Sequence, residues 1–383
     1  MSILGAVIVP HPPLIIPTVG CGREREVQAT IDAYRTAAKQ VAAWEPEALI
    51  VTSPHQIMYT DYFHISPGRA AAGDMSAFGA PQTGLTVQYG EDLRDEAVRR
   101  AEAAGLRAGT LGERDPALDH GTFLPLYFLR EAGVDCPILR VGLSGFSPLD
   151  HYRLGQCIAQ AVEALGRRAV FVASGDLSHK LRDDGPYGFA PEGPEFDRQI
   201  TGAMAAGDFL QFLTMDPALC DRAAECGLRS FQMMAGALDG LAVESKLLSY
   251  EGVTGVGYGV AVFTVTGPDK NRRFGEQCEA MERTRLAEKK AAEDPWVKLA
   301  RLSLETYVKT GRRLERLPEG LPAGMTDRSA GACCCPTWRA WTRWSGRLTS
   351  PGRRAASAPE RSTPWSGSRW CGTHDLRAVF SPL

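Results

Sequence analysis

The feature that most restricts the fold of this chain is a regular alternation of short apolar segments with longer segments of helical periodicity. The short segments are rich in β-branched residues, as buried strands are, and the longer ones repeat apolar residues at the spacing of amphipathic helices. Predicted strands cover 3–9, 48–52, 61–66, 85–90, 136–144, 168–174 and 256–267, and predicted helices cover 24–44, 91–105, 149–166, 193–206 and 222–240. This alternation predicts an α/β fold with a central, mostly parallel or mixed sheet flanked by helices.

Composition and charge narrow the class of protein. The 383 residues are enough for two domains, and 44% hydrophobic with 23% charged residues is typical of a globular chain. A net charge of -2 argues against a nucleic-acid or anionic-membrane surface, and no apolar run reaches the ~20 residues of a membrane-spanning helix. The N-terminus has no basic leader, and most of the ten cysteines are scattered without a CxxC pair, so a reducing, cytoplasmic location is expected.

The chain divides into four stretches. Residues 1–267 carry the strand–helix alternation, 268–293 form a charged linker, and 294–330 begin a second domain with an amphipathic helix. The tail 331–383 differs in composition, because it lacks lysine and isoleucine, contains five of the seven tryptophans and shows no periodicity. We interpret the tail as disordered or, since disordered segments are poor in tryptophan and cysteine, as the product of a shifted reading frame.

Four of the seven histidines fall where an α/β sheet places functional groups. His11, His55 and His179 each follow a predicted strand, and His120 lies in a predicted turn within LDHGTF. Ligands of open α/β sheets bind at the carboxyl ends of the strands, so four histidines meeting there would form a metal site or an acid–base cluster. A single histidine is more often a hydrogen-bonded structural residue, so this prediction depends on the position that the four share.

The nature of a metal site can be argued from its candidate ligands. Two histidines and one carboxylate leave open coordination positions and suit non-haem Fe(II) or catalytic zinc. Glu225 and Cys226 are the candidates for a third ligand, although Glu225 also suits the first turn of a helix. Asp176 lies three residues before His179 and could orient its imidazole, contact a substrate or cap the next turn.

Eight segments, in order along residues 1–267, resemble one known family. They are VPHPPLIIP, SPHQ, LDHGTFLPL, SGDLSHKLRDDGPYGF, EGPEFD, AAECGLRSF, MAGALDG and LSYEGVTGVGYG. Together they are similar to the LigB superfamily, the catalytic subunits of class III extradiol ring-cleavage dioxygenases. More closely, they resemble the branch of the AmmeMemoRadiSam system, which is related to Memo proteins. Residues 294–330 resemble the beginning of an AMMECR domain, which implies that an incomplete α+β domain follows the first.

The resemblance to the dioxygenases implies roles for five residues. In that family two histidines and a glutamate hold the iron, and these correspond to His11, His55 and the region of Glu225. The family's proton-transfer histidine corresponds to His179, and its second active-site histidine corresponds to His120.

The resemblance to Memo proteins implies a different third ligand. Memo-like proteins have a cysteine ligand that corresponds to Cys226 and an aspartate that corresponds to Asp176, so the choice between Glu225 and Cys226 stays open. The family implies an Fe(II) protein, with zinc or copper as alternatives, that oxidises or cleaves a catechol-like aromatic substrate with O₂. The alternative is a Memo-like metal- or peptide-binding component that acts with a radical-SAM partner and cleaves no ring. A zinc hydrolase built on the same histidines is a third hypothesis.

Overall fold

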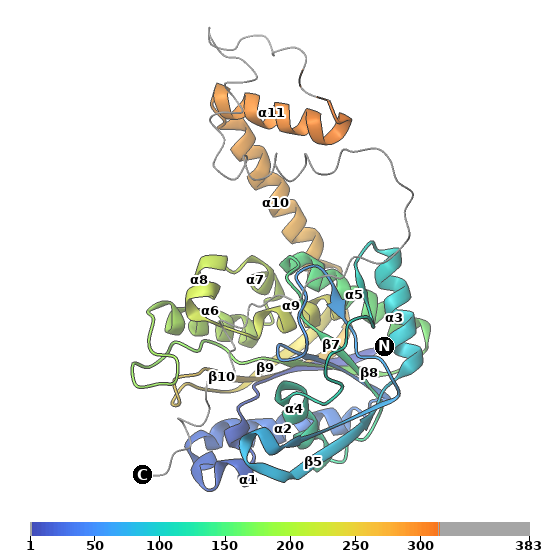
Figure 1. The fold of residues 1–383 in the computed structure, drawn as a ribbon, viewed down its shortest axis with the longest axis vertical. Coiled ribbons are helices and arrows are strands. Elements are labelled where there is room, and N and C mark those ends of the chain that lie inside the picture. Colours follow the sequence, from blue (N-terminus) through green and yellow to red (C-terminus); the bar gives the residue numbers. More distant parts are fainter. Residues whose placement is uncertain (1, 313, 315–383) are drawn as a thin grey trace. The chain divides into compact units, whose positions relative to one another are not determined.

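The computed structural model describes residues 2–312 and 314, and within them six strands form one central sheet (Figure 1). In sheet order the strands are β7 (Ile138–Gly142), β2 (Ala48–Ser53), β8 (Ala169–Ser174), β1 (Ile3–Val9), β10 (Tyr258–Pro268) and β9 (Leu241–Glu251). The strands β7, β2, β8 and β1 are parallel, whereas β10 and β9 run antiparallel to their neighbours. The predicted mixed α/β fold class is therefore confirmed, and the four parallel strands end at one edge.

The central strands are apolar along their whole length because both faces of the sheet are covered. Successive residues of a strand point to opposite faces. In β1, Ala6 and Ile8 belong to one buried cluster, and Val7 and Val9 belong to the other. Phe171 of β8 lies in the first cluster. Continuous apolar strands of this kind are typical of parallel sheets that are buried on both sides.

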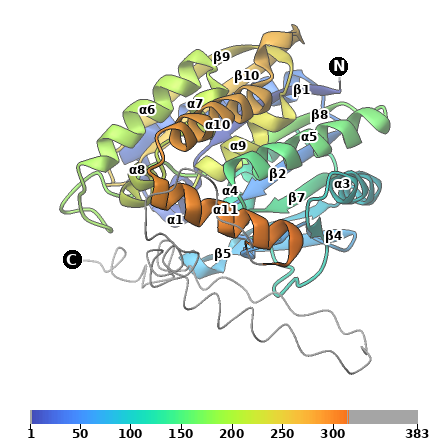
Figure 2. The ribbon, with the colours of Figure 1, turned by 90° about the horizontal axis from the view of Figure 1, so that it is seen from above.

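Helices form a layer on each face. The face of Val7 and Val9 is covered by α2 (Gln28–Ala43) and α4 (His120–Glu131). The opposite face is covered by α3 (Glu91–Ala103), α5 (Pro148–Ala164), α6 (Glu192–Ala206), α7 (Phe209–Thr214) and α9 (Leu228–Ala237), with α5 beside α9 (Figure 2). The sheet thus separates two hydrophobic cores.

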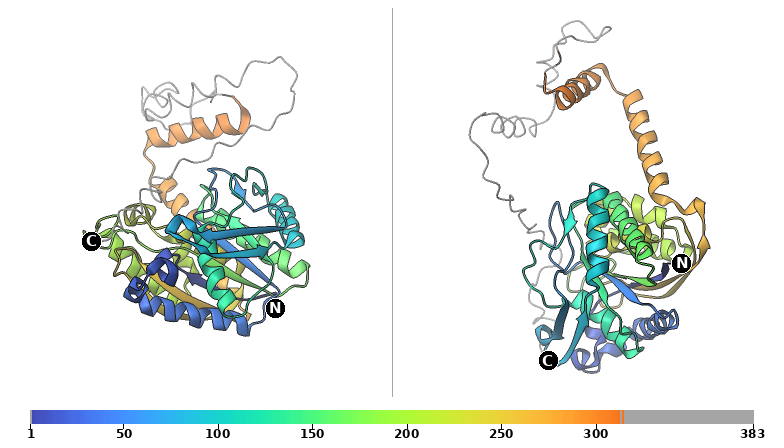
Figure 3. Two further views of the ribbon diagram at one scale, coloured as in Figure 1. Left: turned by 60° about the horizontal axis from the view of Figure 1, so that its bottom comes forward. Right: turned by 90° about the vertical axis from the view of Figure 1, so that its right-hand side faces the viewer.

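Shorter elements complete the described chain. The helical ones are α1 (Pro17–Gly20), α8 (Pro217–Ala223), α10 (Phe274–Ala291), α11 (Pro295–Thr310) and the 3-10 helices η1 (Pro13–Ile15), η2 (Arg23–Val27), η3 (Ser76–Phe78) and η4 (Lys270–Arg272). Within the same residues, β3 (Phe63–His64) pairs with β6 (Ala108–Gly109), and β4 (Ala70–Met75) pairs with β5 (Ala80–Gln88) as a hairpin beside α4 (Figure 3). None of the helices described has the length and apolar character needed to cross a bilayer.

Three elements differ from the sequence-based expectation. The prediction of a turn at His120 is wrong, because α4 begins at this residue. The helix was not recognised because Gly121 and Pro125 have low helix propensity. The edge strand β9 was not predicted, because its sequence LAVESKLLSYE is half polar. The predicted helix 222–240 is interrupted between α8 and α9, where Ala224 adopts a left-handed backbone conformation.

The described residues form two compact units, which meet in sequence between Cys278 and Glu279. The first unit extends past residue 267 because Phe274 and Cys278, in the first turns of α10, pack against its core. In the second unit, Asp294 caps α11 by accepting the backbone N–H groups of its first turn. Residues 313 and 315–330 of the predicted AMMECR-like segment and the whole tail 331–383 lie outside the described residues.

Glycines allow α5 and α9 to pack backbone against backbone. A Cβ atom on Gly155 would overlap the carbonyl oxygen of Met233, and a Cβ atom on Gly236 would overlap the carbonyl oxygen of Tyr152. The two helices can therefore approach this closely only with glycine at both positions.

We expect Gly155→Ala to lower the free energy of unfolding by about 1–3 kcal/mol, because the added methyl group forces the helices apart. The matched control is Gly202→Ala on α6, where no neighbouring heavy atom lies within 4 Å of the new Cβ. That variant should gain about 0.5–1 kcal/mol from helix propensity. Urea unfolding followed by circular dichroism measures the free energy of unfolding of both variants. Equal changes in Gly155→Ala and Gly202→Ala would contradict the close contact between α5 and α9.

Candidate functional site

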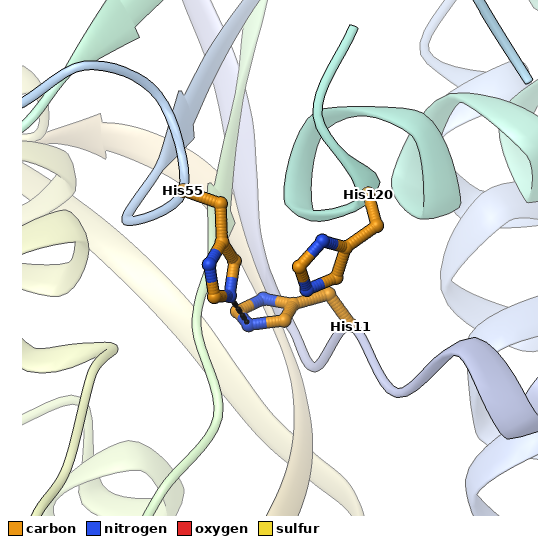
Figure 4. A group of neighbouring side chains, drawn as sticks. All are labelled: His11, His55 and His120. Carbon is orange, nitrogen blue, oxygen red and sulfur yellow. Dashed lines mark hydrogen bonds between the residues drawn. The ribbon is translucent and has the colours of Figure 1, made fainter. Parts of the chain in front are cut away.

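Three imidazoles converge at the carboxyl edge of the parallel strands (Figure 4). His11 follows β1, His55 follows β2, and His120 is the first residue of α4. Their ligand atoms all lie within 4.8 Å of one another, and Nε2 of His11 is 2.9 Å from Nε2 of His55. The structure thus brings together three of the four histidines singled out from the sequence.

The loop after β1 is held by the end of β8. The backbone N–H of His11 donates to Oδ1 of Asp176 at 2.8 Å, and Nδ1 of His11 lies 3.0 Å from Oγ of Ser174. β1 pairs with β8 in parallel, so the ends of the two strands lie side by side. These contacts fix one side of the His11 ring and leave Nε2 facing His55.

A buried ion pair supports the other two imidazoles. The carboxylate of Asp119, the N-cap of α4, accepts the N–H of Thr122 at 3.0 Å and the hydroxyl of Ser53 at 2.5 Å. Oγ of Ser53 in turn accepts the N–H of His55 at 3.1 Å. Arg140 of β7, only 2% exposed, donates to the same carboxylate at 2.9 Å. Burial alone would raise the pKa of Asp119, but Arg140 holds this pKa well below its usual value, so the carboxylate is ionised.

The three converging imidazoles are suited to act as neutral ligands. Burial is the largest cause that lowers the pKa of His11, His55 and His120, and the neighbouring imidazoles lower the pKa of His11 and His55 further. A neutral imidazole offers a lone pair to a divalent cation. Two nitrogen ligands that lie ~2.1 Å from one ion, at right angles, are about 3 Å apart. The 2.9 Å between the Nε2 atoms of His11 and His55 fits a transition-metal ion.

His179 stands outside this group of three and has a defined tautomer. Its Nδ1 lies 2.7 Å from the carbonyl oxygen of Ala224, and a carbonyl can only accept, so Nδ1 carries the proton and Nε2 the lone pair. Ala224 has φ 54°, which is uncommon for a residue with a Cβ and turns this carbonyl toward the ring. Burial lowers the pKa of His179, whereas the nearby carboxyl of Asp176 raises it.

The two candidates for a third ligand have different surroundings. Oε2 of Glu225 accepts the N–H of Leu228 at 2.7 Å, so this carboxylate lies at the first turn of α9. Sγ of Cys226 lies 3.7 Å from Nε2 of His11 and 3.7 Å from the carbonyl oxygen of Asp176. Of the two neighbours, Cys226 is the one for which the structure shows contact with a converging imidazole.

A glycine contact brings Cys226 to the site. A Cβ atom on Gly175 would overlap Cα of Gly227, and a Cβ atom on Gly227 would come within 3.0 Å of the Asp176 carbonyl oxygen. The chain just after β8 and the chain before α9 therefore touch through their backbones. Larger residues at these two positions would move Cys226 away from His11.

The residues that support the site were not singled out from the sequence. Arg140 is a charged residue inside the apolar strand ILRVG, and a buried charge requires a partner, which was a usable signal. Asp119 stands three residues before Thr122 at the start of an apolar segment, as helix-capping residues do. Ser53 and Ser174 gave no signal, because serine at a strand end is common.

Comparison with known proteins identifies the family. The family of the catalytic LigB subunit of aromatic ring-opening dioxygenase matches residues 5–261. This chain belongs to the LigB family. The match spans β1 to β10 and therefore includes every candidate site residue.

Three relatives show how far the similarity of this LigB-family chain extends. It is 33% identical over 347 residues to Protein CA_C1420 of Clostridium acetobutylicum, covering 86% of this chain and 72% of that protein. It is 26% identical over 212 residues to 3,4-dihydroxyphenylacetate 2,3-dioxygenase of Escherichia coli, covering 51% of this chain and 74% of that one. It is 23% identical over 291 residues to the 2-aminophenol 1,6-dioxygenase beta subunit of a Pseudomonas species, covering 68% and 93%. The predicted LigB membership is confirmed, while the Memo-like branch and the AMMECR domain stay predictions.

A second buried carboxylate holds the segment that precedes His179. Asp197 of α6 is 1% exposed; its Oδ1 accepts the N–H of Ser178 at 2.8 Å, and its Oδ2 accepts the hydroxyl of Tyr250 at 2.7 Å. Burial raises the pKa of Asp197 to about 7, and the two hydrogen bonds offset part of this rise.

We expect Asp197→Asn to become more stable relative to the parent protein as the pH rises. The pKa of Asp197 in the folded protein, about 7, lies above the ordinary value of 3.8. Between pH 3.8 and pH 7 the folded state therefore keeps a proton that the unfolded state loses, so the parent protein becomes less stable as the pH rises through this range, with no further loss above it. The slope is at most ~1.4 kcal/mol per pH unit. The asparagine amide can still accept from Ser178 and donate to Tyr250. Denaturant unfolding of both proteins at pH 5, 6, 7 and 8 measures the difference, and a pH-independent difference would refute the expectation.

We expect Asp119→Ala to lower the free energy of unfolding by about 3–5 kcal/mol, because it leaves the Arg140 guanidinium buried without its carboxylate. The control is Glu195→Ala, which removes an exposed ion pair with Arg198 and should change stability by less than ~1 kcal/mol. Urea unfolding compares the variants. If Asp119→Ala lowers the free energy of unfolding by no more than Glu195→Ala does, the buried ion pair does not contribute to stability.

Proposed function

We propose that this LigB-family chain is a metal-dependent dioxygenase that oxidises or cleaves a small catechol-like ring with O₂. The observation that carries the proposal is the 2.9 Å approach of the His11 and His55 Nε2 atoms at the carboxyl edge of the sheet, in a chain whose family opens aromatic rings. The relative named 3,4-dihydroxyphenylacetate 2,3-dioxygenase supports a dihydroxylated aromatic substrate.

We propose Fe(II) as the metal, with zinc and copper as the alternatives. His11 and His55 would hold it, with Cys226 or Glu225 as the third ligand. When bound, Fe(II) supplies the redox chemistry that allows a dihydroxylated ring to react with O₂. Because His11 is held by Ser174 and by its own backbone N–H, its ligand nitrogen is already oriented before any ion binds.

His179 and Asp176 would move and stabilise the proton. Nε2 of His179 has the free lone pair, so it can accept a proton from a substrate hydroxyl group. The nearby Asp176 carboxyl raises the pKa of His179 and so would stabilise the imidazolium that results. His120, at the start of α4, would donate a hydrogen bond to an oxygen atom of the substrate. The proposed roles thus divide the four histidines between holding the metal and handling protons.

The position of Cys226 favours a second candidate function. Its Sγ is 3.7 Å from Nε2 of His11, about the separation of a sulfur and a nitrogen ligand on one ion, whereas the Glu225 carboxylate bonds the first turn of α9. A thiolate ligand is soft and easily oxidised. Such a centre suits a Memo-like metal-binding component that works with a radical-SAM partner and cleaves no ring.

We expect the full chain, purified without oxygen, to contain about one iron per chain by elemental analysis. His11→Ala and Cys226→Ser should lose most of it. Glu225→Gln should keep it, because the glutamine amide oxygen can still accept the N–H of Leu228. Unchanged metal in His11→Ala would rule out the site, and loss in Glu225→Gln but not in Cys226→Ser would reassign the third ligand. Circular dichroism controls for unfolding of each variant.

Oxygen consumption separates the two candidate functions. Addition of 3,4-dihydroxyphenylacetate to the iron-loaded chain should consume O₂ if the chain is a ring-opening dioxygenase, and His179→Gln should abolish this uptake while the metal is retained. A chain that holds iron yet consumes no O₂ with this compound, with catechol or with 2-aminophenol would favour the metal-binding component.

A further inference from the structure

We infer that Phe78 and Tyr187 form an aromatic clamp that decides which ligands the site accepts. The clamp would admit a planar ring and discriminate against other molecules that can bind a metal through two oxygens. This inference rests on the proposed function and adds to it two specificity-determining residues that lie outside the group of histidines.

Each ring of the aromatic clamp lies edge-to-face against a different site histidine. The Phe78 ring is 5.3 Å from the His120 ring, centre to centre, at an interplanar angle of 71°. The Tyr187 ring is 5.1 Å from the His179 ring at 83°. Phe78 ends η3 in the β4–β5 hairpin, whereas Tyr187 belongs to the loop between β8 and α6. Two loops that are distant in sequence therefore each bring one aromatic side chain against a histidine of the candidate site.

The loop that carries Tyr187 is held at its base. The N–H of Leu181 donates to the carbonyl oxygen of Gly255 at 3.2 Å, and the N–H of Ala190 donates to the carbonyl oxygen of Lys180 at 3.0 Å. The ammonium group of Lys180 also donates to the carbonyl oxygen of Tyr187 itself. These contacts position the backbone of Tyr187 next to the site.

Tyr187 faces both the buried centre and solvent. Its side chain is 40% exposed although it touches a buried histidine. An aromatic ring at the boundary between a polar centre and water is well placed to receive an entering ligand.

The clamp would supply a selectivity that the polar groups lack. A metal with histidine ligands accepts many compounds with two adjacent oxygens, aromatic or not. Contacts between aromatic rings are favourable in offset-stacked and edge-to-face geometries, and they require a second ring. A planar dihydroxylated ring would gain these contacts from Phe78 and Tyr187, whereas a compound without a ring would not.

The test compares two probes that both bind a metal through two oxygens: catechol, which has an aromatic ring, and acetohydroxamic acid, which has none. Calorimetric titrations use the iron-loaded full chain without oxygen. Phe78→Ala and Tyr187→Ala should each weaken catechol binding by about three- to ten-fold, with acetohydroxamate binding changed by less than about two-fold. Tyr187→Phe, which keeps the ring, should recover most of the catechol affinity. The control Phe189→Ala removes another exposed aromatic ring of the same loop and should alter neither affinity.

Each other outcome counts against the clamp in a distinguishable way. Equal weakening of both probes would show a general disturbance of the site, and unchanged catechol binding would show that the rings do not touch the ligand; either result overturns the clamp and leaves the proposed function standing. A parent protein that binds acetohydroxamate but not catechol overturns the clamp and the catechol-like substrate together. An iron-loaded parent protein that binds neither probe overturns the clamp and the catechol-like substrate and leaves the metal site standing.

Discussion

The candidate site depends on the parallel register of β2, β8 and β1. Ala173 of β8 pairs with Ile8 on one side and with Thr52 on the other, so the three strands end at the same level. The loops that carry His11, His55 and His179 therefore leave the sheet side by side, although they are far apart in sequence. A shift of one residue in any strand would exchange the side chains that pack into the two cores and would separate the imidazoles, so the packing of both cores also fixes the geometry of the site.

The short break between α8 and α9 concentrates several functions in four consecutive residues. The carbonyl of Ala224 sets the tautomer of His179, and the carboxylate of Glu225 bonds the first turn of α9. The thiol of Cys226 approaches His11, and Gly227 allows the chain to touch the end of β8. Because these four residues are consecutive, a substitution that moves the backbone at one of them would also move the others. Metal binding and proton transfer therefore need to be measured separately in each variant.

Buried carboxylates support the site from two directions. Asp119 is paired with Arg140 and remains ionised, whereas Asp197 accepts hydrogen bonds from the neutral Ser178 N–H and Tyr250 hydroxyl, and burial raises its pKa to about 7. Burying a carboxylate is unfavourable without such partners. Asp119 holds the backbone N–H of His55 through the hydroxyl of Ser53. Asp197 accepts the backbone N–H of Ser178, the residue before His179, directly. Their value lies in holding the loops that present the imidazoles.

The sequence by itself determined the α/β class, the ends of the main strands and the placement of His11, His55 and His179 after them, because apolar periodicity is a local property of each segment. It also indicated the LigB family through short motifs around those residues. Helix α4 was not predicted, since Gly121 and Pro125 oppose a helix locally; the Asp119 cap and packing against α2, β2 and β8 support it in the fold. Edge strand β9 was equally hidden by its polar residues. Only the tertiary structure distinguished Cys226 from Glu225, since adjacent side chains point in different directions and the glycine contact across more than fifty residues of chain decides which one meets His11.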